Sequence, residues 1–408
     1  MKILQVNKYH YYRAGAEKYY LDISNELKKQ GHELAYFAMQ DENNINSKWS
    51  KYFVSKLDFH NLSYKDKLKL PGRIIYSLEA KRKFKKIVED FKPDVIHAHN
   101  IYHHISPSIL SVAKKKNIPV ILHLQDYKII SPNYNIYSHG KNHWDYCGGR
   151  FYRCLFNKCF KNSYIQSFLV SLEYFVHHYL INIYNKNVDV FIAPSLFMKE
   201  KASMFSVEAE KIAVINNHIQ DNEISNEAQP KGDYWLYFGR LAVEKGIQDL
   251  ISALNKIDDN SKLKIAGDGP YKKELEDLIL KLKLNDRVEF LGKKQKQELK
   301  EIIKKAKAVI IPSIWPENFP FALLETIAMG KPAIIANSGG MPEIINHEEN
   351  GFIFEAGNVD DLKEKMLNID KIDYMNMANK ALESSKKYKL SKTIIDLTLL
   401  YNKLVIKK

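Results

Sequence analysis

Short apolar runs and stretches of helical spacing alternate along this chain. An apolar run at residues 2–7 is followed by a loop with Gly15, by helical spacing over residues 16–30 and by a second run at 33–39. Short apolar runs predict buried strands, and a helix between two of them predicts that the strands are parallel. The N-terminal residues are therefore expected to form a β-loop-α-β unit of the nucleotide-binding type.

The same alternation continues through the first half of the chain and is interrupted once. Further strands are predicted at residues 94–97, 120–122, 188–193 and 213–215, with a basic helix over residues 108–116. Between residues 131 and 184 the alternation breaks, and this segment is rich in Tyr, Phe, His and Asn. We expect an insertion there, and its second part, residues 163–184, has helical length.

A polar stretch with Pro230, residues 220–231, shows no apolar periodicity and predicts an interdomain linker. Beyond it the alternation of strands and helices begins again. The expected strands lie at residues 234–238, 263–266, 288–291, 309–311, 333–336 and 352–354, and expected helices at 269–283 and 321–329. Two α/β halves joined by a polar hinge predict an α/β fold of two Rossmann-like domains that face each other across a cleft.

Length and charge narrow the class of protein. The chain has 408 residues, which favours two domains over one, and its net charge of +14 predicts an acidic partner. That partner could be nucleic acid, an anionic membrane surface or a phosphorylated substrate. No apolar stretch reaches the roughly 18 residues that span a bilayer, and residues 1–6 resemble a strand rather than a signal peptide. Three cysteines are too few for a disulfide framework, so we expect a reduced, cytoplasmic setting.

Two glutamates, Glu317 and Glu325, carry the strongest signal for chemistry: the first lies in a predicted loop after a strand, and the second lies at least one turn inside the predicted helix that follows. Glu325 lies among apolar residues on the predicted helix, where an unpaired carboxylate would be expensive to bury. The two hydroxyl donors of a ribose would satisfy it. The loop with Glu317 directs backbone N–H groups and the positive end of the helix dipole towards phosphate or sugar oxygens. An ordinary surface ion pair is the alternative interpretation.

Two further motifs follow predicted strands of the second half. Gly239 ends one strand, and Arg240 and Lys245 follow at the edge where doubly wound sheets bind ligands. Arg binds phosphate through a planar fork and Lys through a mobile point charge. Both suit a diphosphate that gains charge as a glycosidic bond breaks. Gly267 and Gly269 form a second strand-to-helix turn, in which glycine permits close backbone approach.

The order of these motifs resembles glycosyltransferase family 4, whose members are retaining enzymes of the two-Rossmann (GT-B) fold. The matching motifs are Gly-Arg-Leu with Glu-Lys-Gly, Gly-Asp-Gly-Pro, the two glutamates, Gly339-Gly340 with Pro342-Glu343, and Asn350-Gly351. The C-terminal half matches nearly throughout, and the N-terminal half matches at scattered points. The resemblance implies an acceptor-binding domain at residues 1–218, a donor-binding domain at 219–389 and a C-terminal helix at 390–408 that packs on the first domain.

The resemblance also implies a role for each donor-site residue. Arg240 and Lys245 would hold the donor diphosphate, and Glu325 would hold the ribose hydroxyls. Glu317 would hold the sugar together with the backbone that follows it. The remaining donor-site positions are Gly239, Gly267, Gly269, Leu291, Gly292, Asn318, Phe319, Pro320, Phe321 and Leu324.

The first loop of the N-terminal half departs from the family. The family's loop reads Gly-Gly-x-Glu, whereas this chain has Ala14 before Gly15 and Glu17. Because one glycine is lost, the closest approach of the backbone to the donor phosphate is expected to change at Ala14.

A second departure follows the strand at residues 120–122. The family commonly places a His near the sugar in a Leu-His-Asp-Tyr segment. Alignment on Asp126 puts Gln125 at that position and His123 two residues earlier, so either side chain could take the role. Glutamine can hydrogen-bond a sugar hydroxyl but cannot titrate. Asp126 could instead cap a local turn.

His97 and His99 lie at the end of another predicted strand. We expect His97 to be packed in the core. His99 is expected either to point towards the cleft and the substrate or to be structural.

The insertion holds all three cysteines and a nearby histidine. These residues are His143, Cys147, Cys154 and Cys159. Four such ligands could hold a structural zinc ion, although no Cys-x₂-Cys pair is present and small buried thiols are the alternative. The chain also has no Asp-x-Asp, which argues against the metal-dependent glycosyltransferases of a single Rossmann domain. We therefore expect a reaction that requires no metal or other cofactor.

Part of the excess of positive charge lies in basic runs of the first half, beside an aromatic segment at residues 168–184. They are Lys65, Lys67, Lys69, five residues within 81–86, and residues 114–116. Most such runs are solvated helix faces, but these would suit docking on anionic lipid that presents a lipid-linked acceptor.

The resemblance and the residues together predict transfer of a hexosyl or N-acetylhexosaminyl group from a UDP- or GDP-linked donor to a hydroxyl of a saccharide or lipid-linked acceptor. The expected setting is bacterial surface-polysaccharide assembly (capsule, O-antigen or exopolysaccharide), in the cytoplasm or at the inner face of the membrane. One alternative is a nucleotide-sugar epimerase or hydrolase of the same fold. Another is a non-catalytic protein that binds membrane or nucleic acid, but the donor-site residues argue against it, and we expect no nucleic-acid partner.

Overall fold

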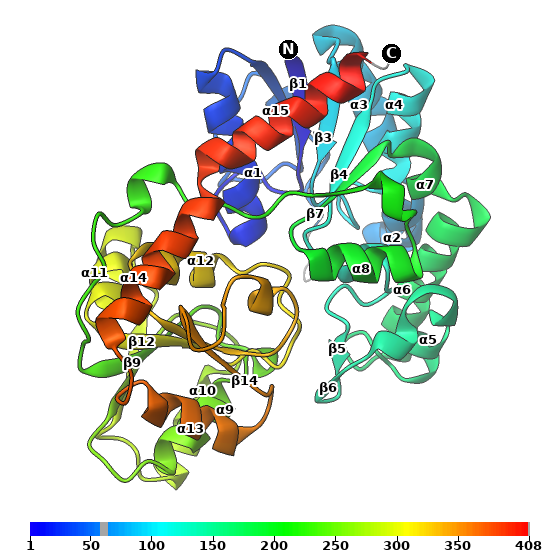
Figure 1. The fold of residues 1–408 in the computed structure, drawn as a ribbon. Coiled ribbons are helices and arrows are strands. Elements are labelled where there is room, and N and C mark those ends of the chain that lie inside the picture. Colours follow the sequence, from blue (N-terminus) through cyan, green and yellow to red (C-terminus); the bar gives the residue numbers. More distant parts are fainter. Residues whose placement is uncertain (58–63, 407–408) are drawn as a thin grey trace. The chain divides into compact units, whose positions relative to one another are not determined.

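The computed structural model describes residues 1–57 and 64–406, with the side chains of the second range described from residue 70. The side chains of Lys65, Lys67 and Lys69 lie outside this part. The chain forms two compact units, residues 1–215 with 394–408 and residues 216–393 (Figure 1). Among the described residues, no helix combines the length and the apolar character that a membrane crossing requires.

The first unit is built on a six-stranded sheet with the order β2-β1-β3-β4-β7-β8. The strands are β1 (Lys2–Val6), β2 (Glu33–Phe37), β3 (Val95–Ala98), β4 (Val120–His123), β7 (Val190–Ala193) and β8 (Ile212–Val214). Every neighbouring pair is parallel. All six strands predicted in this half are therefore confirmed, and the carboxyl ends of parallel strands meet at one edge of the sheet.

Helices connect these strands because their apolar residues recur at helical spacing. They are α1 (Gly15–Lys29), α2 (Tyr64–Tyr76), α3 (Leu78–Phe91), α4 (Leu110–Lys115) and α8 (Leu196–Phe205). In α3 the buried positions include Phe84, Ile87 and Phe91, which form one face. The helix begins where Ser77 accepts a hydrogen bond from the Ala80 N–H, and it ends at Lys92 with a φ of 53°.

The insertion between β4 and β7 forms a small subdomain. It contains a hairpin of β5 (Tyr137–Ser138) and β6 (Lys141–Asn142), then α5 (Arg153–Phe156), α6 (Tyr164–Phe175) and α7 (Ile183–Asn187). The single helix predicted over residues 163–184 is wrong. A π-helical turn at Val176–Leu180 ends α6, and Asn182, with a φ of 47°, changes the direction of the chain before α7.

A buried ion pair attaches α6 to the turn that follows β4. Lys128 Nζ donates to Glu173 Oε2 at 2.8 Å, and both side chains are buried. His103 Nδ1 lies 3.3 Å from the same oxygen. Burial would raise the pKa of Glu173, but the charges of His103 and Lys128 hold it well below its usual range. The insertion is thus joined to the first unit through a charged interior contact.

The second unit repeats the parallel arrangement with the order β11-β10-β9-β12-β13-β14. The strands are β9 (Tyr234–Phe238), β10 (Lys262–Ala266), β11 (Val288–Gly292), β12 (Ala306–Ile311), β13 (Ala333–Ala336) and β14 (Gly351–Phe354). The helices are α9 (Ile247–Asn255), α10 (Lys272–Lys281), α11 (Lys296–Lys304), α12 (Phe321–Ala328), α13 (Val359–Asn368) and α14 (Tyr374–Ser385). The six strands predicted here are confirmed as well, so the fold is α/β with two Rossmann-like sheets.

The last helix, α15 (Leu390–Ile406), is red in Figure 1. Its residues from 394 onwards belong to the first unit. Tyr401 is fully buried there, and its hydroxyl lies 2.7 Å from His97 Nδ1 on β3. A polar contact therefore attaches the helix to the sheet of the first unit.

Candidate active site

Glu317 lies between β12 and α12 in a buried position. Its Oε1 is 2.5 Å from Lys245 Nζ and accepts a hydrogen bond from Ser313 Oγ at 2.9 Å. Lys245 also lies over the ring of Trp315, with Nζ 4.8 Å from the ring centroid. The structure thus brings together two predicted site residues from separate loops and restrains both side chains.

Gly339 explains how a third loop packs against Glu317. It has a φ of +68°, and a Cβ at this position would lie 2.1 Å from Glu317 O. The next residue, Gly340, donates its N–H to the same oxygen at 2.7 Å. Only glycine fits this approach, since any side chain would displace the backbone that carries Glu317.

The loops after β9 and β10 are in direct backbone contact. Gly239 N–H donates to Ala266 O at 3.0 Å, and Leu241 N–H donates to Asp268 O at 3.0 Å. A Cβ on Gly267 would lie 1.9 Å from Gly239 O. The two glycine motifs therefore form one platform at the carboxyl edge of the sheet, where α/β sheets bind ligands.

Arg240 extends from this platform into solvent. Its guanidinium forms an ion pair with Glu244, and more than half of its side chain is exposed. Tyr237, a residue that the sequence did not single out, donates its hydroxyl to Arg240 O at 2.9 Å. Burial, with a smaller contribution from the Glu317 charge, raises the pKa of Tyr237 well above its usual range. Tyr237 is therefore a neutral donor that supports the Arg240 backbone.

The turn from β10 into α10 and the end of β11 lie next to one another. Gly269 N–H donates to Asp268 Oδ1 at 2.9 Å, and the helix begins later than predicted, at Lys272. Gly267 N–H donates to the carbonyl of Gly292, the last residue of β11, at 2.8 Å. Leu291, which precedes Gly292, is partly exposed.

Several of the predicted site residues around the start of α12 have buried side chains. Phe319 and Leu324 are buried in the hydrophobic core of the second unit, so a ligand could reach them only through the backbone. Asn318 is also buried. Pro320 precedes the first helical residue, Phe321, which is partly exposed. The N terminus of α12, where the backbone N–H groups point along the helix axis, follows the Glu317 loop directly in the chain.

Glu325 lies in the second turn of α12 and is partly exposed, not buried. Its neighbours Leu323, Thr326 and Ile327 are buried. The predicted apolar surroundings of Glu325 are therefore confirmed, although the residue itself is partly exposed.

In the first unit, Gly15 and Glu17 open α1. Ala14 precedes the helix with a φ of −150°, an extended conformation that any residue adopts, so the loss of glycine there causes no backbone strain. Glu17 is buried, and burial raises its pKa against the effect of its own backbone and of Arg13. Burial and the Arg13 charge lower the pKa of Lys8 to about 8. A closely spaced group of charges therefore surrounds the start of α1.

At the end of β4, Gln125 and His123 occupy different environments. His123 is the last strand residue and is buried, with its ring 4.3 Å from the ring of Tyr19. Gln125 is partly exposed, and its N–H donates to His123 O at 3.1 Å. Asp126 accepts from Lys128 N–H at 2.9 Å, which confirms the turn cap. Burial raises the pKa of Asp126 to about 6.

His99 is also buried, which favours the structural role among the two alternatives expected for it. Its Nε2 lies 2.9 Å from Gln5 Oε1. Its ring stacks on that of His97 with centroids 4.2 Å apart. Side chains two residues apart along a strand project to the same face, so His99 follows His97 into the interior.

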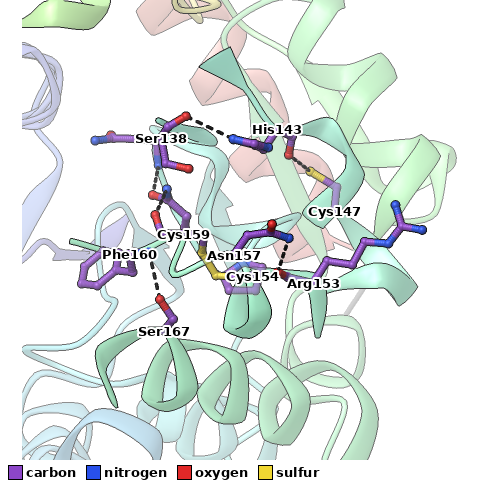
Figure 2. Close-up of a disulfide and its surroundings, with 12 residues drawn as sticks. Ser138, His143, Cys147, Arg153, Cys154, Asn157, Cys159, Phe160 and Ser167 are labelled. Atoms are coloured by element: carbon purple, nitrogen blue, oxygen red, sulfur yellow. Dashed lines mark hydrogen bonds between the residues drawn. A yellow bond between two sulfur atoms is a disulfide. The ribbon is translucent and has the colours of Figure 1, made fainter. Parts of the chain in front are cut away.

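The four residues predicted as a zinc set do not form one (Figure 2). Cys154 and Cys159 are joined by a disulfide, so neither sulfur is a thiolate ligand, and the expectation of reduced cysteines is wrong for this pair. His143 Nε2 lies 3.1 Å from Ser138 O, and the Cys147 thiol donates to His143 O at 4.0 Å. Burial raises the pKa of Cys147 to about 12, which keeps it a neutral thiol. Spacing identified candidate ligands but not which side chains meet.

Comparison with known families agrees with this architecture. A family model described as Glycosyltransferase Family 4 matches residues 13–223, more than half of the chain, and one described as Glycosyl transferases group 1 matches residues 219–387. Two Rossmann-like sheets with this set of loops define a glycosyltransferase of the GT-B fold. The chain belongs to glycosyltransferase family 4.

Individual relatives differ in how much of the chain they cover. The uncharacterized glycosyltransferase MJ1607 of Methanocaldococcus jannaschii is 37% identical over 40% of this chain and 46% of its own length, so the match spans about half of that relative. An uncharacterized 42.6 kDa protein in the cps region of Klebsiella pneumoniae is 25% identical over 91% of this chain and 97% of its own. The crystal structure of Anabaena HepE in complex with UDP is similar over 99% of this chain and 100% of that one, with a TM-score of 0.70 and 19% identity.

Proposed function

We propose that this protein transfers a sugar from a UDP- or GDP-linked donor to a hydroxyl group with retention of the anomeric configuration. The observation that carries the proposal is the pairing of Lys245 with Glu317 beside the N terminus of α12, in a member of family 4. A cation, a carboxylate and the positive end of a helix dipole in one place suit the diphosphate and the hydroxyls of a nucleotide sugar.

The reaction exchanges one bond at the anomeric carbon for another and moves one proton. The bond between the anomeric carbon and the diphosphate oxygen breaks, and its electron pair leaves with the nucleoside diphosphate. The acceptor oxygen bonds to the same face of the sugar, and its proton passes to the departing diphosphate. Negative charge therefore grows on the leaving group, where Arg240 and Lys245 would stabilise it more in the transition state than in the ground state. In this proposal the transfer needs no metal, so added Mg²⁺ or Mn²⁺ should leave turnover unchanged.

Glu317 would act as a positioned acceptor for sugar hydroxyls. The contacts with Lys245 and Ser313 restrict the carboxylate of Glu317, so this side chain loses little conformational freedom when the sugar binds. A lysine ammonium has three donors, and the contact with Glu317 uses one of them. The same Lys245 can therefore hold Glu317 and contact the diphosphate.

The nucleoside would lie along α12 and the end of β11. Glu325 is partly exposed and would accept from both ribose hydroxyls, while Leu291 and Gly292 would contact the base. The similarity to a structure that contains UDP supports UDP-sugars as the first donors to test.

For the residue near the sugar in the first unit, we propose Gln125 rather than His123. Gln125 is partly exposed, whereas the His123 ring is buried against Tyr19. A glutamine suffices, because the acceptor proton passes to the donor phosphate and no side chain has to titrate. Gly15 and Glu17 at the start of α1 would lie beside the donor phosphate and the sugar, as in the family's pattern.

We further propose a saccharide or lipid-linked acceptor and a role in surface-polysaccharide assembly. The Klebsiella relative, which is similar along nearly its whole length, is described as a protein in a cps region, and this supports the setting. A hexosyl or N-acetylhexosaminyl donor fits the same setting.

Exposed apolar side chains on the insertion support docking at the inner face of an anionic membrane. Phe156, Ile165 and Phe168 are each at least half exposed on α5 and α6, and Lys158 Nζ lies 4.5 Å from the centroid of the Tyr164 ring. Residues 114–116 and most of the cluster within 81–86 expose their cationic side chains as well. Aromatic residues that enter the interface and cations that attract anionic headgroups together favour membrane association.

Thermal shift with a panel of nucleotide sugars tests the donor assignment. The matching donor should raise the melting temperature, since a ligand that binds the native state stabilises it by mass action. Arg240→Ala and Glu325→Ala should lose that shift, while Lys264→Ala, a surface change on β10, should keep it. If both site variants keep the full shift, the donor site is elsewhere. Mass spectrometry of the products then separates transfer from epimerisation or hydrolysis.

A further inference from the structure

Three histidines meet in the interior of the first unit. His97 lies on β3, His99 follows that strand, and His123 ends the neighbouring strand β4. One ring nitrogen from each lies within 4.8 Å of the other two, and none of the three rings is more than 1% exposed. Their rings are nearly parallel, with interplanar angles of 16° to 28°.

Two of the histidines have one nitrogen hydrogen-bonded and one nitrogen without a hydrogen-bond partner. His97 Nδ1 lies 2.7 Å from the Tyr401 hydroxyl, and His97 Nε2 has no partner among the described residues. His99 Nε2 donates to Gln5 Oε1 at 2.9 Å, and His99 Nδ1 has no partner in the same part of the chain. A buried polar atom without a partner costs free energy, so its retention needs an explanation.

This pattern is typical of metal-binding histidines. A metal-ligating imidazole usually gives its other N–H to an oxygen acceptor, which orients the ring and sets the tautomer. Gln5 on β1 and Tyr401 on α15 supply those oxygens here. The arrangement leaves a lone pair on His99 Nδ1 and allows one on His97 Nε2, both within the group of three.

The charge state of the cluster agrees with the same role. Burial lowers the pKa of His97 to about 3. Burial, with the neighbouring His97 and His123, lowers the pKa of His99 well below its usual range. His97 and His99 are therefore neutral at pH 7, which is the protonation state that binds a metal ion.

We propose that His97, His99 and His123 bind one divalent transition-metal ion, with Zn²⁺ as the ion to test. Three imidazole nitrogens suit zinc, copper or nickel, whereas Mg²⁺ and Ca²⁺ prefer oxygen ligands. A tetrahedral Zn²⁺ with Zn–N distances of about 2.0–2.1 Å needs nitrogens roughly 3.4 Å apart, so the rings would close by about 1 Å on binding.

The ion would have a structural role. It would link β3 to β4 directly, and through Gln5 and Tyr401 it would link both strands to β1 and α15. The site lies on the first unit and involves neither Arg240, Lys245, Glu317 nor Glu325. Its test is therefore independent of the donor-site proposal.

Metal content and stability together test this inference on the full chain. Protein expressed with added zinc and dialysed against metal-free buffer should contain about one Zn²⁺ per chain by inductively coupled plasma mass spectrometry. His99→Asn and His123→Asn should each reduce this at least five-fold. The control His347→Gln, a change at an exposed loop residue of the second unit, should keep it.

A second measurement does not depend on the folding of the variants. Wild-type protein unfolded in urea and refolded with Co²⁺ should show the visible d–d absorption of a nitrogen-coordinated ion, and its melting temperature should rise above that of protein refolded with chelator. Less than 0.1 equivalent of zinc together with no cobalt absorption would overturn the proposal and leave three histidines that are only packed against one another. An equal loss of zinc in His347→Gln would also overturn it, because the metal would then be bound elsewhere.

Discussion

Lys245 Nζ lies 2.5 Å from Glu317 Oε1, although 72 residues of sequence separate the two. The contact joins the loop after β9 to the loop before α12. It places a cation that suits a diphosphate next to a carboxylate that suits a sugar, so the orientation of one residue depends on the other.

Glu317→Gln should lower kcat by about 100-fold while the fold is retained, a cost comparable to the loss of one positioned polar group in a transition state. Glutamine keeps one oxygen acceptor but loses the charge that holds Lys245. Kinetics with the matched donor, with circular dichroism as the check on folding, measure the effect. Lys245→Ala and the double variant complete a cycle, and strictly additive effects would contradict the coupling.

Gly339→Ala should destabilise the protein by about 2–3 kcal/mol, because a methyl group would collide with Glu317 O and the backbone has a positive φ. Gly357→Ala is the matched control, since Gly357 has a φ of +81° and nothing within 4 Å of a Cβ. It should cost only about 1 kcal/mol for the conformation alone. Urea unfolding measures the free energy of unfolding of both variants. Equal losses would mean that the contact with the Glu317 loop has no energetic role.

Asp126→Asn should become more stabilising as pH rises from about 4 to above 6. The folded-state pKa of Asp126 is raised to about 6, so its stabilising contribution is present below the unfolded pKa and is lost as pH rises through the folded value. Asparagine keeps the oxygen that caps Lys128 N–H but does not ionise. The gain over wild type should reach about 2 kcal/mol at pH 7.

Urea unfolding at pH 4, 5, 6 and 7 measures this difference. The exposed Asp277→Asn is the control, because it removes the same charge from the surface of α10. A difference between Asp126→Asn and wild type that stays constant across this range would contradict the proposed cause.

Replacement of Phe156, Ile165 and Phe168 by Ser should abolish flotation with vesicles that contain phosphatidylglycerol. These residues supply exposed apolar area on the insertion, and the loss of three such side chains removes several kcal/mol of interfacial binding. Leu280→Ser, which removes an equally exposed apolar residue from α10, should still float. Wild-type flotation that does not depend on anionic lipid would contradict the electrostatic part of the proposal.

Much of the fold follows from local pattern. Each of the twelve predicted strands is present, because an apolar run in a parallel α/β protein is buried on both faces and stands out from its polar loops. Helix ends were less predictable. The chain between residues 163 and 184 has helical composition throughout, yet the turn at Val176–Leu180 ends α6, where His177 Nε2 binds Ile75 O at 2.6 Å. A contact with a residue so distant in sequence is invisible to periodicity.

The residues of the candidate site were also only partly predictable from the sequence. Glu317, Arg240 and Lys245 were identifiable from residue type and from their position after strands. Tyr237 and Ser313 were not, because a tyrosine inside a strand and a serine after one have no special spacing. Their roles exist only through the contacts with Arg240 O and with Glu317 Oε1.

The sequence by itself determined the two α/β halves, the order of the glycine and glutamate motifs and the membership of a family. Those features depend on local periodicity and on residue types at short spacing. The tertiary structure alone decided that Lys245 meets Glu317, that Cys154 pairs with Cys159 and that His97, His99 and His123 share one interior site. Such contacts depend on which strands lie side by side and on how closely the loops approach one another. The packing of the whole unit decides both.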